Sequence, residues 1–120
     1  MIKLRVTNVT RGTLLANRAD IADTASKSRT GLRGRARIEA GEGLWIAVCE
    51  AVHTFGMRFP IDVVFLDRKK RVVKTRANVS RGRIAFSLRA NSVLELPAGT
   101  LDATRTRPGD QLAFEKHPSG

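Results

Sequence analysis

One apolar segment, residues 61–66, restricts the possible folds more than any other part of this 120-residue chain. Its sequence, Ile-Asp-Val-Val-Phe-Leu, is short and rich in β-branched and aromatic residues, which predicts a buried β-strand. Pro60 precedes it and has no backbone N–H, so the chain turns or lies at a sheet edge there. Because burying a lone carboxylate is costly, we expect Asp62 to be paired or hydrogen-bonded.

Other apolar or alternating segments predict further short strands. The predicted strands cover residues 2–9, 14–21, 44–49, 61–66, 71–75, 84–88, 92–96 and 111–115. In one of them, Ile84, Phe86 and Leu88 alternate with smaller or polar residues, so we expect these three side chains to face the core.

Helical signals are few. Asp23 or Thr24 can cap a short helix over residues 24–30, and Thr100 can cap one helical turn that ends near Ala103. We therefore predict an α+β, β-dominated fold: a small, mostly antiparallel barrel or sandwich of about seven or eight short strands with one short helix. Residues 1–115 would form a single domain, and residues 116–120 a frayed C-terminal tail.

Residues 53–67, HTFGMRFPIDVVFLD, resemble the signature of the family called domain of unknown function 192 (DUF192). That signature has a Met, a basic or polar residue, a short gap, and a strand with Asp at its second position. Residues 30–32 resemble the family's Gly-Leu step, and residues 94–99 with 109–110 resemble its C-terminal block. Together the segments span roughly residues 14–115. The resemblance implies a small, mostly β fold and no particular reaction.

Asp62 is an acidic residue inside an apolar strand, and Glu95 is a second one, because it lies between two leucines of a predicted strand. Our leading interpretation is a non-enzymatic binding or accessory domain with a polar pocket around these carboxylates. The pocket residues would be His53, Met57, Arg58, Asp62 and Glu95. The simpler alternative is a structural ion pair between one carboxylate and an arginine. A third interpretation is a hydrolase-like enzyme that uses Asp62 and Glu95.

The net charge of +11 points to another kind of function. Residues 27–37 and 68–89 are rich in Lys and Arg and contain no acidic residue, so the chain is attracted to polyanions. It could bind nucleic acid or an acidic partner, or it could simply carry a solvated basic surface. The residues of a polyanion-binding module would be Arg29, Arg33, Arg35, Arg37, Lys69, Lys70, Arg81 and Arg83.

The sequence gives little support to metal or cofactor binding. The only histidines are His53 and His117, and no HxxxH, HxH or CxxC motif is present, so we expect neither a metal nor a cofactor. The single cysteine, Cys49, lies in an apolar run that predicts a buried thiol. The first residues lack the apolar core of a signal peptide and no segment reaches the roughly 20 apolar residues of a membrane helix, so we expect a cytoplasmic protein without a membrane span.

Overall fold

The structure is a computed structural model that describes residues 2–22, 37–47, 51–54 and 57–118. These residues form nine strands and one short helix. The elements are β1 (Ile2–Asn8), β2 (Thr13–Ala22), β3 (Glu42–Ala47), β4 (Ala51–His53), β5 (Ile61–Leu66), β6 (Val72–Val79), β7 (Ile84–Phe86), β8 (Ser92–Pro97), α2 (Thr100–Thr104) and β9 (Leu112–Pro118).

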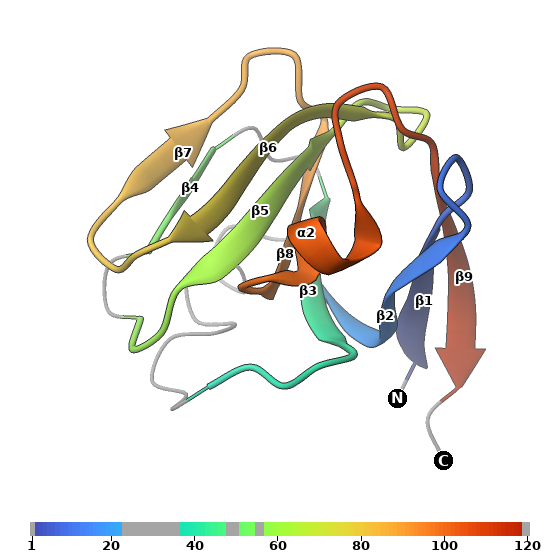
Figure 1. Ribbon diagram of the computed structural model, residues 1–120, viewed down its shortest axis with the longest axis horizontal. Coiled ribbons are helices and arrows are strands. Elements are labelled where there is room, and N and C mark those ends of the chain that lie inside the picture. The colour runs from blue at the N-terminus through green and yellow to red at the C-terminus, as the bar shows by residue number, and fades with distance from the viewer. Residues whose placement is uncertain (1, 23–36, 48–50, 55–56, 119–120) are drawn as a thin grey trace.

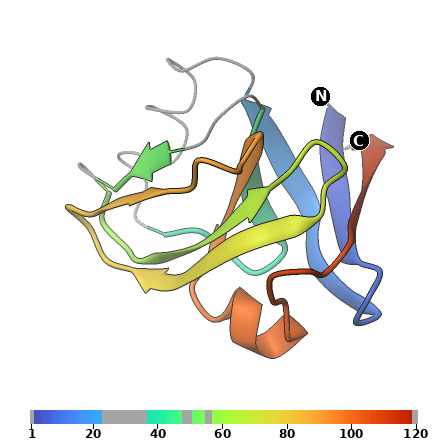
Figure 2. The same ribbon diagram turned by 90° about the horizontal axis from the view of Figure 1, so that it is seen from above.

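Seven of the strands form one curled sheet in the order β6-β5-β8-β3-β2-β1-β9, and β4 pairs with β7 in a separate two-stranded sheet (Figure 1). Within the large sheet all pairs are antiparallel except β2 with β3. Figure 2 shows how the sheet bends into a half-barrel. The predicted β-dominated, mostly antiparallel fold is therefore confirmed.

The bend brings the two edge strands of the large sheet together at one end. Arg71, just before β6, pairs with Gln111, just before β9. Backbone hydrogen bonds reinforce this junction: the Val72 N–H donates to the Asp110 carbonyl at 2.8 Å and the Gly109 N–H to the Val72 carbonyl at 2.7 Å. The half-barrel is thus tied at this end by backbone contacts, which satisfy groups that an edge strand would otherwise leave open.

Both faces of the central strands are buried, because their side chains alternate between two apolar clusters. The inner core lies within the curl and beneath α2, where strands of the large sheet and the helix contribute to it. Its members are Leu4, Val6, Leu15, Ala16, Ala19, Val64, Leu66, Val72, Leu94, Leu96, Leu101 and Leu112. The outer core lies on the opposite face, and β4 and β7 contribute to it. Its members are Ala22, Leu44, Ile46, Val52, Met57, Ile61, Val63, Phe65, Val79, Ala85 and Val93.

One predicted strand has its faces reversed. We expected Ile84, Phe86 and Leu88 to be buried, but they are 62%, 54% and 80% exposed, and Ala85 is the buried residue. The reason is tertiary: β7 pairs with β4, where Ala85 lies opposite the buried Val52, so the small side chain faces the outer core. Ile84 and Phe86 therefore lie on the solvent face of β7, and Leu88 is exposed in the turn that follows the strand.

The C-terminal end of the chain also differs from expectation. β9 continues through residues 116–118, beyond the predicted strand end at 115, and Ile2 pairs with Pro118. Part of the predicted tail is therefore a paired strand. The predicted helix over residues 24–30 and the predicted buried thiol of Cys49 lie outside the described residues.

Tight packing between strands predicts the effect of one substitution. A Cβ atom on Gly43 of β3 would lie 3.1 Å from the Glu95 carbonyl oxygen and 3.1 Å from Leu96 Cδ2. Because the carbonyl belongs to a paired central strand and cannot move freely, we expect Gly43→Ala to destabilise the fold by about 1–3 kcal/mol. Urea unfolding followed by circular dichroism measures this; an unchanged midpoint would show that the strands separate easily here.

Candidate functional site

Asp62 is the most completely satisfied of the predicted site residues. It is fully buried on β5, and its two oxygens accept three backbone N–H bonds. Oδ1 accepts from Asn78 at 2.8 Å, and Oδ2 accepts from Gly99 at 3.1 Å and Leu101 at 2.8 Å. The expectation that Asp62 has a partner is met, although the partners are backbone groups and not an arginine. Such an arrangement holds β6 and the start of α2 against β5.

The local chain geometry explains these bonds. The register between β5 and β6 shifts between Ile61 and Val63, which marks a β-bulge opposite Asp62. Asn78 has a positive φ of 52° in this irregular part of β6, and its N–H turns to the carboxylate. Gly99 has a φ of 98°, a conformation that suits glycine, where the chain enters α2. The carboxylate thus satisfies N–H groups that the regular ladder and the short helix leave open.

Asp62 and Glu95 do not converge. On the paired strands β5 and β8, Asp62 lies opposite Leu96, whereas Glu95 lies opposite Val63. Cross-strand partners share a face and successive residues alternate, so Asp62 belongs to the inner face and Glu95 to the outer face. The sheet itself separates the two carboxylates. The common pocket that we predicted around them is not formed.

Glu95 has an unusual environment. It is 4% exposed on the outer face, with Leu44 and Val63 as its cross-strand neighbours. Burial raises the pKa of Glu95 from 4.5 to about 8, because the charged form loses its hydration. Glu95 is therefore mostly a neutral carboxylic acid at pH 7, which makes it unsuitable as an ion-pair partner at that pH.

The remaining members of the predicted pocket are dispersed. Met57 is buried in the outer core, on the same side of the sheet as Glu95. His53 is half-buried at the end of β4, and Arg58 is exposed. Of the five predicted residues, the structure therefore places Met57 and Glu95 on the same face of the sheet and Asp62 on the other.

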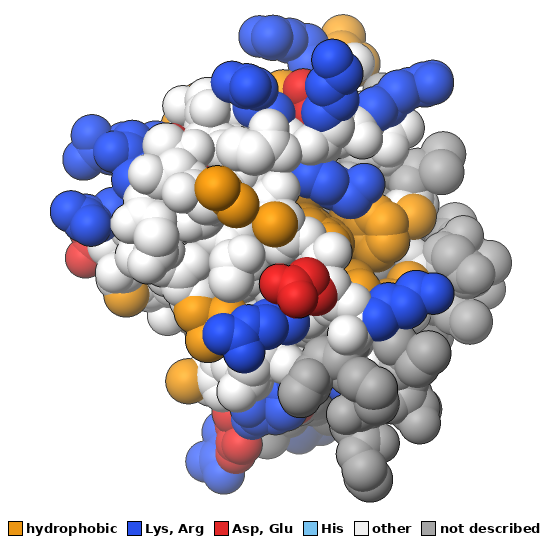
Figure 3. All heavy atoms as spheres, turned by 90° about the vertical axis from the view of Figure 1, so that its right-hand side faces the viewer, with side chains coloured by type: hydrophobic (Ala, Val, Ile, Leu, Met, Phe, Trp, Pro, Cys, Tyr) orange, Lys and Arg blue, Asp and Glu red, His pale blue; other side chains and the backbone are white. Residues whose placement is uncertain are grey.

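The predicted polyanion-binding residues do not form one compact patch where the structure describes them. Arg29, Arg33 and Arg35 lie outside the described residues. Lys69 and Lys70 lie before β6 and Arg81 and Arg83 after it. An eight-residue strand is about 26 Å long, so these two pairs are far apart. In Figure 3, Lys and Arg side chains are distributed over the visible face in separate groups with uncharged surface between them.

Two of these basic residues already have protein partners. The Arg37 guanidinium lies 3.3 Å from a carboxylate oxygen of Glu39. The Lys70 ammonium lies 4.9 Å from the ring centroid of Trp45 and 5.7 Å from that of Phe114. These cation–π contacts anchor Lys70 to the edge of the inner core, where Trp45 and Phe114 pack against it.

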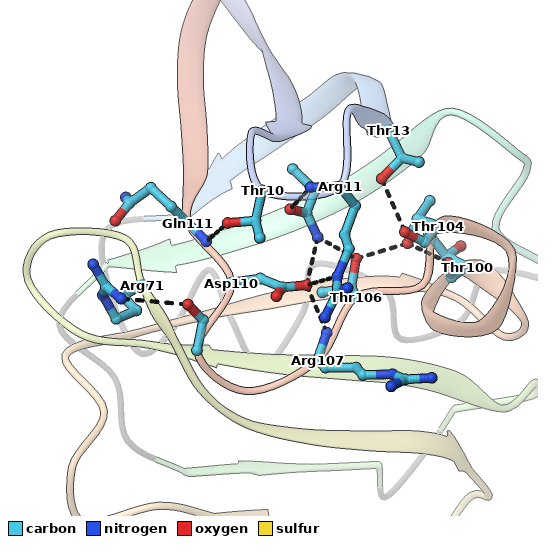
Figure 4. A network of polar contacts seen from close by, with 12 residues as sticks. Thr10, Arg11, Thr13, Arg71, Thr100, Thr104, Thr106, Arg107, Asp110 and Gln111 are labelled. Carbon is cyan, nitrogen blue, oxygen red and sulfur yellow. Dashed lines mark hydrogen bonds and ion pairs between the residues drawn. The ribbon is translucent and has the colours of Figure 1, made fainter.

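A polar network that the sequence analysis missed surrounds Asp110 (Figure 4). Asp110 Oδ2 accepts hydrogen bonds from Asn8 Nδ2 at 2.9 Å, Arg11 Nε at 3.1 Å and the Arg107 backbone N–H at 3.0 Å. Burial alone would raise the pKa of Asp110, but these hydrogen bonds and the Arg11 charge outweigh burial and lower it. Asn8 Nδ2 also donates to Thr106. The network ties the β1–β2 turn to the segment between α2 and β9.

Large apolar side chains are exposed on β7 and in the turn that follows it. We call Ile84, Phe86 and Leu88 the β7 strip. Lys74 of β6 reaches this strip: its ammonium donates to the Phe86 carbonyl at 2.6 Å and lies 5.3 Å from the Phe86 ring centroid. No sequence signal marks this surface, because an alternating strand pattern does not say which face is buried.

Neither a metal-binding group nor a membrane-spanning helix is found among the described residues. They contain no group of three or more His, Cys, Asp or Glu side chains that could hold a metal ion. No helix within the described ranges is long and apolar enough to cross a membrane.

We expect Asp62→Asn to destabilise the protein by about 3 kcal/mol, because an amide group would face backbone N–H donors that now bond to a carboxylate. The exposed Asp102→Asn in α2 is the matched control and should change stability by less than about 0.5 kcal/mol. Urea unfolding at pH 7 compares them. Equal midpoints for both variants would contradict the structural role of Asp62.

The buried acid gives a pH dependence with a defined sign. Folded Glu95 keeps its proton up to about pH 8, whereas the unfolded chain releases it near pH 4.5, so raising the pH between these values favours unfolding. We expect Glu95→Gln to be more stable than the unmodified chain at pH 8, with a difference that shrinks toward pH 4.5. Thermal melts across this range test it. A difference that is constant with pH would contradict the buried neutral acid.

The comparisons with known proteins agree with this fold. A protein of unknown function from Novosphingobium aromaticivorans superimposes with a TM-score of 0.79 at 20% identity, covering 92% of this chain and 83% of that one. A "putative transcription regulator" from Sinorhizobium meliloti gives a TM-score of 0.82 at 21% identity, covering 95% and 94%. A "putative exported protein" from Burkholderia pseudomallei gives 0.51 at 14% identity, covering 96% of this chain and 25% of that one. At such identities the likeness concerns the fold alone.

No curated protein matches the chain. The model of the family DUF192, described as "Uncharacterized ACR", matches residues 6–114, which is most of the chain. The predicted resemblance is thereby confirmed, and the family description assigns no activity. The chain belongs to the DUF192 family.

Proposed function

We propose that this chain is a non-enzymatic binding domain that recognises an acidic segment of another protein through the β7 strip and the basic residues beside it. The observation that carries the proposal is the coincidence of exposed apolar side chains with a stretch of one charge sign. The exposed Arg81, Arg83 and Arg89 flank the strip in sequence, and residues 80–94 contain no Asp or Glu.

The apolar part of the surface supports association with a protein. Ile84, Phe86 and Leu88 are each more than half exposed and lie within five residues. Single exposed apolar side chains are common, but a group of large ones close together is typical of interaction surfaces. Burying one such side chain in an interface contributes about 1.5–3 kcal/mol.

The charged part of the surface supports an acidic partner. Arg81 and Arg83 precede the strip and Arg89 follows it, and all three are exposed. Among the described residues no acidic group forms an ion pair with them. A second copy of this chain would be repelled, because it carries the same +11 charge. Carboxylates next to apolar side chains are the complementary chemistry.

The composition of the strip favours an acidic protein over nucleic acid. Unstacked bases bind mainly on aromatic side chains, and Phe86 is the only aromatic member of the strip. Ile84 and Leu88 are aliphatic, and they suit apolar side chains of a peptide better than bases or phosphates. The proposal thus retains the binding-domain interpretation and moves the binding surface from the Asp62–Glu95 pocket to β7.

Fluorescence anisotropy tests the proposal with three labelled probes: a short peptide that alternates glutamate with leucine and phenylalanine, a single-stranded RNA, and a DNA duplex. At near-physiological salt we expect the peptide to bind and both nucleic acids to dissociate, because phosphate contacts weaken steeply with salt. Nucleic-acid binding that is tighter than peptide binding at this salt would overturn the acidic-protein assignment.

A pair of matched double variants locates the surface. Phe86→Ser with Leu88→Ser removes apolar area from the strip without a change of charge, and we expect peptide affinity to fall at least about tenfold. Val9→Ser with Leu14→Ser makes the same kind of change at exposed residues of the β1–β2 region and should leave affinity unchanged. Equal effects of the two double variants would place the binding surface elsewhere.

A further inference from the structure

A recess beside α2 is independent of the β7 strip. It has a volume of about 260 Å³ and is lined from β6, α2 and the turn that follows α2. The lining residues that matter for the argument are Thr75, Ala77, Leu101, Asp102, Arg105 and Arg107.

The recess and the strip lie on opposite faces of β6. Thr75 lies opposite Val64 of the inner core, whereas Lys74, which contacts Phe86 of the strip, lies opposite Phe65 of the outer core. Because successive residues of a strand alternate between its faces, a ligand in the recess would not contact the strip. The two surfaces can therefore be tested separately.

The backbone around the recess is held in place from both sides. Asp62 accepts the N–H of Leu101, and the Leu101 carbonyl accepts the N–H of Thr106 at 3.1 Å. The next N–H, that of Arg107, donates to the buried Asp110. A rigid backbone lowers the entropic cost of binding, because the side chains that contact a ligand start from fixed positions.

Two arginines project from this fixed segment without protein partners in the described part of the chain. The guanidinium groups of Arg105 and Arg107 form no ion pair or hydrogen bond with another described side chain. In Figure 4 the side chain of Arg107 extends away from Asp110, although its backbone N–H bonds to that residue. Arginine is the side chain best suited to bind carboxylate or phosphate with two parallel hydrogen bonds.

The other polar groups narrow the class of ligand. Asp102 lies in the same recess and is exposed, so it is available to accept a hydrogen bond from a hydroxyl or amino group. The side chains of Leu101 and Ala77 supply apolar contacts. A volume of 260 Å³ is slightly below the roughly 300–1,000 Å³ of sites for drug-sized ligands, so the recess suits a smaller molecule.

We propose that this recess binds a small organic anion that carries a carboxylate or phosphate group for Arg105 and Arg107 and a hydroxyl or amino group for Asp102. This site is distinct from the proposed protein-binding surface and does not depend on it.

Two-dimensional NMR of the full chain tests the proposal with glycerol phosphate and malate as probes and with inorganic phosphate and acetate as simpler anions. We expect saturable shifts of the amides of residues 75–77 and 101–107, with tighter binding of the two hydroxylated probes. Comparing the two phosphate probes with the two carboxylate probes shows which anionic group the arginines prefer. Shifts that spread over basic residues throughout the chain and do not saturate would overturn the proposal, since they indicate only a counterion atmosphere.

Charge-matched variants make the test specific. Arg107→Gln, alone and combined with Arg105→Asn, should weaken binding of both hydroxylated probes at least tenfold. The control, Arg5→Gln with Arg68→Gln, changes two exposed arginines outside the recess and should leave binding of these probes unchanged. Asn is chosen at position 105 because this residue has a φ of 57° and Asn tolerates that conformation. An equal loss of affinity in the recess variants and in the control would overturn the proposed site. The dispersion of each NMR spectrum shows whether the variant is folded.

Asp102→Asn distinguishes the contribution of the ligand's hydroxyl or amino group from that of its anionic group. Removing the carboxylate should strengthen binding of acetate and inorganic phosphate, because a repulsive charge is lost, and should reduce the advantage of glycerol phosphate and malate over them. An unchanged order of affinities would refute the role of Asp102 and, with it, the hydroxyl or amino group of the ligand.

Discussion

The hydrogen bonds that Asp62 accepts are the constraint on which the rest of the structure depends. One buried carboxylate on the central strand β5 holds the bulge of β6 through Asn78 and the entrance to α2 through Gly99 and Leu101. A five-residue helix cannot be stable by itself, because helix nucleation is unfavourable and its first N–H groups have no intrahelical acceptor. A side-chain oxygen of Asp62 accepts hydrogen bonds from the N–H groups of Gly99 and Leu101 and holds the short helix over the inner core.

The Asp110 network complements this arrangement from the other side. Asp110 joins the β1–β2 turn through Asn8 and Arg11 to the segment after α2 through Arg107. Together with the backbone bonds between the β6 and β9 ends, it fixes the half-barrel where its edges meet. The turn that presents Arg105 and Arg107 is thus held by two buried carboxylates, one at each end. A rigid turn of this kind is well suited to present two cations to a ligand.

Glu95 illustrates why two similar sequence patterns have different roles. Both carboxylates lie between apolar residues in adjacent, paired strands, but their register places them on opposite faces. On the inner face Asp62 meets backbone N–H groups that need an acceptor; on the outer face Glu95 meets apolar side chains, and its raised pKa is the consequence. A one-residue offset between strands therefore decides whether a buried acid meets backbone N–H donors or apolar side chains. No pattern within a single strand contains that information.

The sequence by itself determined the fold class, most strand positions and the need of Asp62 for a partner, because these follow from local periodicity and from the cost of burying charge. Only the tertiary structure decided which face of each strand is buried, how far the basic residues lie from one another, and where the recess forms. Ala85 points inward and Phe86 outward because β7 pairs with β4. Asn8 meets Asp110 across about a hundred residues because β1 pairs with β9, which places Asn8 opposite Leu112. Such contacts depend on pairing and curvature, which are properties of the whole chain and not of any segment.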